Sequence, residues 1–200
     1  MARPATRLLF LDACIRRERS RTEALAQAYL RLREKLGPVE CQQVILEEET
    51  LLPLNEQRLQ EREEAIQKGD YSGEAFRLPR QLAWAQELVI AAPYWDLSFP
   101  ASLKVYWENC CVYGLTFRYT PEGKPRGLTA LQKATYLTTA GGIIGTADFG
   151  FLYLQGLLQG LLGVHTVERF AAEGLDIQGN SPTEILHHTI QEMERHLLNP

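Results

Sequence analysis

The stretch Leu88-Val89-Ile90-Ala91-Ala92 has only apolar side chains, and a proline follows it directly at position 93. An apolar run of this length, without alternating polar residues, is typical of a parallel β-strand that is buried on both faces. Parallel sheets of this kind are covered by helices on both sides. The stretch therefore predicts the central strand of an α/β domain, and the proline predicts where that strand ends.

Further strand candidates lie on both sides of this run, with helical patterns between them. The strand candidates are residues 8–11, 39–46, 134–138 and 164–170. The helix candidates lie within residues 24–36, 56–68, 78–86, 101–113, 148–162 and 181–197. Strands that alternate with helices predict an open, doubly wound parallel sheet of five strands with helices on both faces. Since no repeat or linker interrupts the pattern, we expect residues 1–200 to form a single domain.

The composition is that of an ordinary globular protein, in which 45% of the residues are hydrophobic, 23% are charged and 9% are aromatic. This excludes a disordered or fibrous chain. The 21 Lys and Arg residues are outnumbered by 25 Asp and Glu residues, which gives a formal net charge of −4. A general nucleic-acid-binding protein would usually be basic, so we expect no nucleic-acid partner.

The cysteines and the apolar segments of the sequence indicate the cellular compartment in which the protein is expected. Cys14, Cys41, Cys110 and Cys111 lack the spacing of a disulfide framework or a zinc site, so we expect free thiols in a reducing compartment and no metal. The apolar run near the N-terminus is too short for a secretory signal. Residues 149–167 are uncharged, but four glycines and two glutamines interrupt them, which makes a poor membrane span. We expect a cytoplasmic protein without a membrane partner.

In open parallel sheets, ligands bind beyond the carboxyl ends of the strands, so the loops at those ends are the candidate sites. The loop after the first strand leads through Ser20, Arg21 and Thr22 into a predicted helix. The free N–H groups of a helix N-terminus, together with hydroxyl groups and arginines, suit a phosphate. The alternative is that Ser20 only caps the helix while the arginines face solvent. The loop lacks the glycines of a Walker A motif or a dinucleotide fingerprint.

Two more loops at the same edge suit a flat ring. Tyr94 and Trp95 follow the central strand, and aromatic side chains at a strand end can contact a planar group. Gly141 and Gly142 follow the next strand, and glycines allow the backbone to approach a ligand closely. The alternatives are aromatics that cover the core and an ordinary glycine turn. A phosphate site beside a ring site indicates a mononucleotide bound at the end of the sheet, for which FMN is the obvious candidate.

Three segments resemble the FMN-dependent NAD(P)H azoreductases and related quinone reductases. Residues 114–120, Gly-Leu-Thr-Phe-Arg-Tyr-Thr, match that family's Gly-x-Thr-Phe-Arg-Tyr-Thr pattern. Residues 91–96 and 103–106 are similar to its Ala-Pro-Met-Tyr-Asn-Phe and Leu-Lys-x-Tyr-Phe-Asp segments. The similarity covers most of the chain and is poor over residues 48–77.

The family's Ser-x-Ser phosphate element resembles Ser20 and Thr22, and its Ser-Arg-Gly-Gly is similar to residues 139–142. The resemblance implies a flavodoxin-like fold with strand order 2-1-3-4-5 and a bound FMN. Through that FMN, two electrons would pass in a ping-pong cycle from NADH or NADPH to a quinone, an azo compound or a similar acceptor. It also implies a homodimer with the sites at the interface between the subunits.

The resemblance also implies the site residues. Those for the phosphate are Ser20, Arg21 and Thr22. Those for the ring are Pro93, Tyr94, Trp95, Asp96, Leu97, Thr139, Ala140, Gly141 and Gly142. Phe117 and Tyr119 would lie near the substrate, in their own subunit's site or the partner's, with packing inside their loop as the alternative. No side chain is expected to act as a nucleophile or general acid, because the chemistry takes place on the flavin.

Four positions depart from the family pattern. Ala13 stands in place of a serine, Asp96 of an asparagine, Ala140 of an arginine and Ile144 of a histidine. A carboxylate at position 96 would disfavour the negatively charged reduced flavin unless it were protonated or turned away. The departures motivate the alternative of a non-catalytic α/β module that has lost FMN. Size and acidity also permit a flavodoxin-type electron carrier.

Overall fold

The apolar run at the centre of the sequence forms β3 (Glu87–Ala91), the middle strand of a five-stranded sheet in the computed structural model, which describes residues 4–198. The strand order is β2-β1-β3-β6-β7, and each neighbouring pair is parallel. The other strands are β1 (Thr6–Asp12), β2 (Val39–Ile45), β6 (Lys133–Thr139) and β7 (Thr166–Ala172). Numbered within this sheet alone, the order is 2-1-3-4-5, so the predicted flavodoxin-like fold is confirmed.

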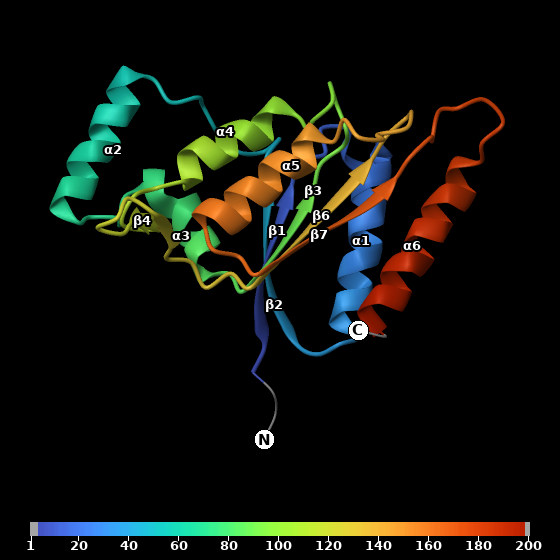
Figure 1. The fold of residues 1–200 in the computed structure, drawn as a ribbon, viewed down its shortest axis with the longest axis horizontal. Helices are drawn as coiled ribbons and strands as arrows, with labels where there is room; N and C mark the ends of the chain where they lie inside the picture. Colours follow the sequence, from blue (N-terminus) through green and yellow to red (C-terminus); the bar gives the residue numbers. More distant parts are fainter. Residues whose placement is uncertain (1–3, 199–200) are drawn as a thin grey trace.

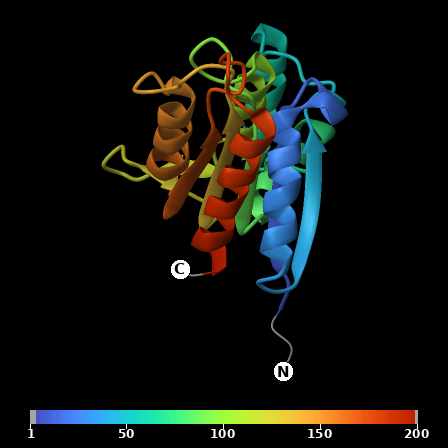
Figure 2. The same ribbon diagram turned by 90° about the vertical axis from the view of Figure 1, so that its right-hand side faces the viewer.

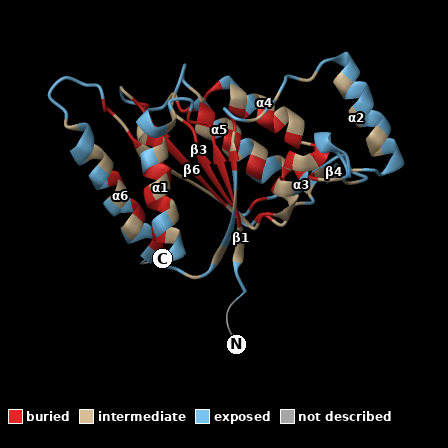
Figure 3. Ribbon diagram, turned by 180° about the vertical axis from the view of Figure 1, so that it is seen from behind, coloured by how far each residue is buried: buried red, intermediate tan, exposed pale blue. Residues whose placement is uncertain are grey.

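Helices cover both faces of the sheet, as Figure 1 and Figure 2 show. On one face, α1 (Arg21–Glu34) and α6 (Pro182–Leu198) pack against each other and against the strands. On the other face lie α3 (Arg77–Trp84), α4 (Ala101–Cys110) and α5 (Phe149–Gln155). Figure 3 shows the buried residues gathered in the strands and on the helix sides that face them.

Alternate residues of β1 belong to two separate cores. Leu8 and Phe10 pack with α1 and α6, while Leu9 and Leu11 pack with the helices of the opposite face. All four side chains are at most 1% exposed, and each such burial contributes about 1.5–3 kcal/mol. Burial on both faces explains why residues 8–11 of β1 and 88–91 of β3 are continuous apolar runs.

The N-terminus of α1 is fixed at the carboxyl edge of the sheet by a local signal and by packing. The Ser20 side chain caps the helix by accepting a hydrogen bond from the N–H group of Glu23 at 3.3 Å. Leu25, Tyr29 and Leu32 recur at helical spacing and are buried against the sheet. The cap and the apolar face together place the first turn of α1 beside the ends of β1 and β6.

The segment between α4 and β6 is more regular than the sequence predicts. Residues 114–132, for which the sequence predicts no strand, contain an antiparallel hairpin of β4 (Phe117–Tyr119) and β5 (Pro125–Gly127). Each of these strands is three residues long and largely exposed, so no apolar pattern indicates it.

The helix expected over residues 148–162 also differs from the prediction, because α5 continues into a π-helical turn at Gly156–Leu161. This turn leads to the contact between helix and hairpin. A Cβ atom on Gly127 would lie 1.8 Å from the carbonyl oxygen of Leu162, so only glycine fits there.

The remaining elements lie at the periphery. α2 (Glu56–Lys68) has no buried residue, begins at an Asn55 cap and ends at Gly69 with φ 66°. Two short 3₁₀ helices span Arg17–Arg19 and Glu74–Phe76. Among residues 4–198, no helix is both long and apolar enough to cross a membrane.

Candidate functional site

The loops after β1, β3 and β6 meet at the carboxyl edge of the sheet around a cavity of about 240 Å³. Eight of the predicted site residues line it: Ser20, Arg21, Thr22, Pro93, Tyr94, Trp95, Thr139 and Gly141. Six predicted residues do not line it: Asp96, Leu97, Ala140 and Gly142 of the ring loops, and the predicted substrate residues Phe117 and Tyr119. The structure therefore brings the loop after β1, predicted to bind a phosphate, together with parts of the loops after β3 and β6, predicted to bind a ring, around one cavity.

The first turn of α1 forms one end of the cavity. The backbone N–H groups of Arg21 and Thr22 make no hydrogen bond within residues 4–198, as expected at a helix N-terminus. The Thr22 hydroxyl lies 2.6 Å from the Thr139 hydroxyl and is buried, so it ties α1 to the end of β6. This end combines free donors with the partial positive charge of the helix, a combination that suits an anion.

Three arginines add positive charge to the same end. Arg16 and Arg19 are exposed, line the cavity and form no ion pair with a described residue. Arg21 lines it as well, and its guanidinium group donates to the carboxylate of Asp176 at 2.9 and 3.2 Å. The Arg21 contact holds the pKa of the Asp176 carboxyl below its ordinary value.

An ion pair between the buried Asp12 and the partly exposed Arg17 shapes the loop that carries these arginines. The Asp12 carboxylate, which is fully buried at the end of β1, accepts from the N–H of Cys14 at 2.8 Å and from Arg17 at 2.7 Å. Burial lowers the pKa of the Arg17 guanidinium, but the hydrogen bond to Asp12 and its charge leave that pKa above the ordinary value. Arg17 therefore anchors the loop and does not face the cavity.

Cys14 in this loop is a structural thiol. It is buried, and its Sγ atom lies 3.6 Å from the carbonyl oxygen of Ala91. Desolvation by burial raises the pKa of the thiol far above its ordinary value, so a nucleophilic thiolate does not form there.

Among residues 4–198, no three His, Cys, Asp or Glu side chains gather in a way that could hold a metal ion.

The loop after β3 forms an aromatic rim. Tyr94 is held by two hydrogen bonds: its N–H donates to the carbonyl of Thr139 at 3.0 Å, and its hydroxyl donates to the carbonyl of Ala147 at 2.9 Å. Trp95 beside it is 39% exposed. Tyr94 thus joins the loops after β3 and β6, and Trp95 presents an apolar surface at the mouth of the cavity.

A strained turn follows Trp95. Its N–H and carbonyl groups pair with those of Ser98 at 3.0 and 2.8 Å, which closes a tight turn around Asp96 and Leu97. These two residues have φ values of 49° and 65°, a left-handed conformation that costs free energy in residues other than glycine. Their N–H groups donate to no group within residues 4–198, and both side chains are exposed. Strain held at a site edge, with free donors, is typical of a ligand-binding turn.

The loop after β6 forms a glycine rim. A Cβ atom on Gly141 would lie 2.4 Å from a carboxylate oxygen of Asp176, whereas one on Gly142 would meet nothing within 4 Å. Neither glycine's N–H group has a partner within the described chain. Ala140 is buried beneath them and donates its N–H to Ala172 at 2.9 Å, so it supports the rim without lining the cavity.

Phe117 and Tyr119 lie apart from this cavity within one chain. Phe117 lines a different groove of about 360 Å³, beside α2 and Tyr113. Tyr119 is 53% exposed and stacks on Tyr113 with ring centroids 6.5 Å apart. Both aromatics belong to the cluster of the β4–β5 hairpin.

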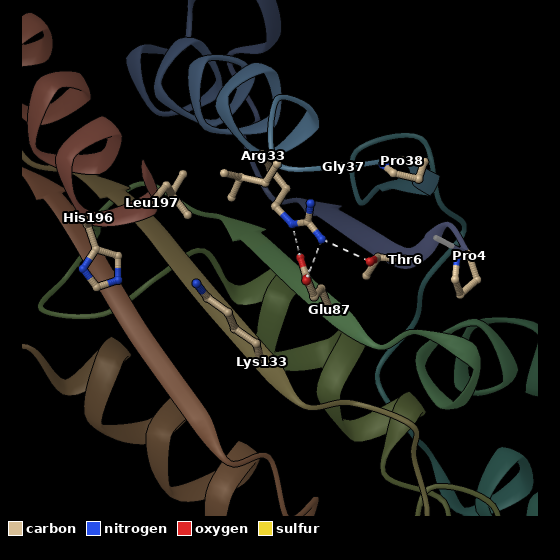
Figure 4. Close-up of a pocket in the computed structure, with 10 residues that line it drawn as sticks. Pro4, Thr6, Arg33, Gly37, Pro38, Glu87, Lys133, His196 and Leu197 are labelled. Carbon is tan, nitrogen blue, oxygen red and sulfur yellow. Dashed lines mark hydrogen bonds and ion pairs between the residues drawn. The ribbon is translucent and has the colours of Figure 1, made fainter. Parts of the chain in front are cut away.

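A larger cavity, of about 520 Å³, lies at the opposite, amino edge of the sheet (Figure 4). Its charged side chains are already paired. Arg33 donates to the carboxylate of Glu87 at 2.7 and 2.9 Å, and Lys133 lies 2.7 Å from Glu168. The cavity at the carboxyl edge, whose N–H groups and two of whose arginines have no partner within residues 4–198, is the better candidate for a ligand.

Four residues that line the carboxyl-edge cavity were not predicted: Ile15, Arg16, Arg19 and Asp176. The arginine-rich composition of the first loop was a usable signal for Arg16 and Arg19. Asp176 lies in the loop after β7, whose carboxyl end reaches the same edge of the sheet. Inspection of that fifth strand end would have found it.

Comparison with known proteins agrees with this geometry. Over residues 6–197 the chain matches the protein family described as having a flavodoxin-like fold. It is 41% identical over 117 residues to FMN-dependent NADH:quinone oxidoreductase 2 of Clostridium acetobutylicum, a match that covers 56% of this chain and 58% of that protein. The chain thus spans just over half the length of the curated relatives it matches.

Solved structures resemble nearly the whole chain. An azoreductase from Bacillus anthracis superimposes with a TM-score of 0.82 at 25% identity, covering 96% of this chain and 98% of that one. An FMN-dependent NADH-azoreductase from Bacillus anthracis, solved in complex with FMN, gives a TM-score of 0.81 at 20% identity, with the same coverage of 96% and 98%.

Proposed function

Because the chain belongs to the family with the flavodoxin-like fold, we propose that it is an FMN-dependent oxidoreductase. It takes two electrons from NADH or NADPH and passes them, in a ping-pong cycle, to a quinone, an azo compound or a similar acceptor. One observation carries the proposal: a single cavity joins the N-terminus of α1 to an aromatic rim and a glycine rim. The names of two curated relatives, both called FMN-dependent NADH:quinone oxidoreductases, support NADH and a quinone as the substrates.

The α1 end of the cavity fits the phosphate of FMN. The N–H groups of Arg21 and Thr22 are free to donate, and the helix places partial positive charge behind them. The guanidinium groups of Arg16 and Arg19, which form no ion pair within the described part of the chain, add charge that matches a phosphate dianion. Ser20 holds the first turn in shape through its cap.

The opposite end fits the ring system. The N–H groups of Asp96, Leu97, Gly141 and Gly142, which have no acceptor among residues 4–198, would be donors for the oxygen and nitrogen atoms of the ring. At about 240 Å³, the cavity is smaller than the roughly 300–1,000 Å³ of pockets that enclose a whole ligand. The ring would therefore lie across the exposed rim beside Trp95, where a nicotinamide or a quinone could stack on it.

When bound, FMN supplies the hydride- and electron-transfer chemistry. The residues of this chain hold and orient it. Backbone N–H groups of the glycine rim stabilise negative charge at the polar edge of the ring, since donors fixed in advance need no reorganisation. Water at the open rim supplies the protons that the acceptor takes up.

Asp96 tunes the bound flavin. Its carboxylate is exposed and has no partner among residues 4–198, so it places a negative charge near the ring. That charge disfavours the reduced flavin. We expect Asp96→Asn to raise the two-electron midpoint potential of bound FMN by roughly 10–30 mV, measured by reduction against a reference dye. An unchanged potential would show that the carboxylate does not act on the ring.

The functional unit is a homodimer whose interface includes the exposed side of α5. Phe149 and Leu152 are each 55% exposed on this helix. The N–H of Phe149 donates to the carbonyl of Leu97 at 3.2 Å, so this apolar surface is continuous with the mouth of the cavity. In a dimer, Phe117 and Tyr119, which lie apart from their own cavity, are available to line the partner's site.

The protein acts in the cytoplasm. All four cysteines, at positions 14, 41, 110 and 111, are free thiols, which a reducing compartment maintains.

Turnover by the reconstituted protein tests the proposal. Protein loaded with FMN should be yellow and should oxidise NADH or NADPH when 1,4-benzoquinone is supplied, with the parallel double-reciprocal lines of a ping-pong cycle. Protein that holds FMN but shows no turnover would contradict the enzyme and favour an electron carrier. Protein that fails to bind FMN would favour a non-catalytic module.

A further inference from the structure

A carboxylate shares the anion-binding end of the cavity. Asp176 lines it, and its two oxygens accept hydrogen bonds from the guanidinium group of Arg21 at 2.9 and 3.2 Å. Arg21 reaches from the first turn of α1, whereas Asp176 comes from the loop after β7. The ion pair therefore bridges two loops directly at the place where a phosphate would bind.

Asp176 is held in this position. Its N–H group donates to the carbonyl of Gly141 at 2.9 Å, and Arg21 also donates to the carbonyl of Leu175 at 3.3 Å. The absence of a side chain on Gly141 leaves the space that the Asp176 carboxylate occupies. The contact is thus built from fixed backbone, although both side chains remain partly exposed.

A phosphate and this carboxylate need the same partner. A phosphate at the N-terminus of α1 would bind the N–H groups of Arg21 and Thr22 and the guanidinium group of Arg21, a residue that lines the cavity together with Arg16 and Arg19. The carboxylate already occupies that guanidinium group and repels a dianion at short range. The exposed ion pair is weak enough to be displaced.

We propose that Asp176 is an affinity-determining residue, whose carboxylate competes with the phosphate of the ligand for Arg21 and so keeps the ligand exchangeable. The inference rests on the proposed function, because it takes FMN as the ligand. In the free protein, Arg21 holds Asp176, and in the complex Arg21 turns to the phosphate. A phosphate-free flavin meets no such competition.

The test compares FMN with riboflavin, which lacks the phosphate. Dissociation constants from quenching of flavin fluorescence are measured for the wild type, Asp176→Asn and the matched control Glu18→Gln. Glu18 is an exposed acidic residue of the same region that does not line the cavity. Asp176→Asn should bind FMN about fivefold more tightly, the order expected for one exposed charge pair, and riboflavin within about twofold of the wild type. Glu18→Gln should change neither by more than about twofold.

A second substitution separates competition from general repulsion. If Asp176 acts by occupying Arg21, then Asp176→Asn should bring little gain in FMN affinity in a chain that already carries Arg21→Gln. The inference is overturned if Asp176→Asn weakens FMN binding, if it strengthens riboflavin binding equally, or if the gain is the same without Arg21.

Inorganic phosphate distinguishes failure of this inference from failure of the proposed function. The stabilisation of the protein by inorganic phosphate is measured as the rise in Tm. This rise should be larger for Asp176→Asn than for the wild type. If neither the wild type nor any variant binds FMN, but phosphate stabilises Asp176→Asn more than the wild type, the proposed flavin function is wrong and the competition for Arg21 is supported. If FMN binds Asp176→Asn and the wild type equally tightly, the competition for Arg21 is wrong and the proposed flavin function is supported. If neither ligand binds any variant, both fall.

Discussion

At the scale of single residues, the hydroxyl pair of Thr22 and Thr139 joins the start of α1 to the end of β6. The two oxygens are 2.6 Å apart and buried. Thr22→Val keeps the shape but leaves the Thr139 hydroxyl without its partner, which should cost about 1–3 kcal/mol of the free energy of unfolding. Urea denaturation measures this. The control Thr50→Val, at an exposed position, should stay within about 0.5 kcal/mol. Equal effects of the two substitutions would contradict the role of the pair.

Glu168 makes stability depend on pH in the acid range. It accepts from Thr135 at 2.8 Å and pairs with Lys133 at 2.7 Å and His196 at 2.9 Å. Burial raises the pKa of this carboxyl, but these partners outweigh burial and leave the pKa below its ordinary value of 4.5. A carboxyl with a lowered pKa stabilises the folded state above its unfolded pKa, and that stability is lost as the pH falls through the folded value.

Glu168→Gln should therefore lose less stability than the wild type between about pH 6 and about pH 3. Urea unfolding at a series of pH values gives the two curves. Glu192→Gln, at an exposed position on α6, should follow the wild-type curve. Parallel curves for Glu168→Gln and the wild type would show that the native contacts of this carboxylate do not shift its titration.

At the scale of elements, the β4–β5 hairpin depends on one close approach of backbone. A Cβ atom on Gly127 would lie 1.8 Å from the carbonyl oxygen of Leu162, so Gly127→Ala must move the hairpin or the end of the π-helical turn. We expect a loss of about 1–3 kcal/mol in urea denaturation. Gly73→Ala, where a Cβ atom would meet nothing within 4 Å, is the matched control. A neutral Gly127→Ala would mean that hairpin and helix are not packed as described.

At the scale of the whole molecule, the two apolar side chains exposed on α5 predict the oligomeric state. Leu152→Glu places a charge in the proposed interface and should convert a dimer into a monomer in sedimentation analysis. Leu36→Glu, at a position that is 38% exposed near the amino edge of the sheet, should leave the dimer intact. A monomeric wild type, or a dimer that survives Leu152→Glu, would contradict the interface on α5.

The sheet was predictable from the sequence because its inner strands β1, β3 and β6 are largely buried on both faces. Apolar runs such as residues 88–92 indicate this burial in the sequence itself. The hairpin was not predictable, because Phe117–Tyr119 and Pro125–Gly127 are short, exposed and held by turn geometry. The π-helical turn was also not predictable, because the sequence of residues 156–161 is compatible with an ordinary α-helix.

The candidate site was predictable where its features are local. Ser20 and Thr22 stand at a helix start that the sequence marks, and Tyr94 and Trp95 directly follow a strand. Asp176 was not predictable in this way, because its partner Arg21 lies 155 residues away and the contact forms only when the loop after β7 folds back. The positions of Phe117 and Tyr119 depend on how the hairpin packs, which motif similarity does not determine.

A crystal structure of the protein with FMN would show where the phosphate and the ring bind. We predict phosphate oxygens within about 2.7–3.2 Å of the N–H groups of Arg21 and Thr22, with the ring across the rim formed by Trp95 and Gly141. Flavin bound instead in the amino-edge cavity beside Arg33 and Lys133, or crystals that take up no flavin at saturating FMN, would contradict it.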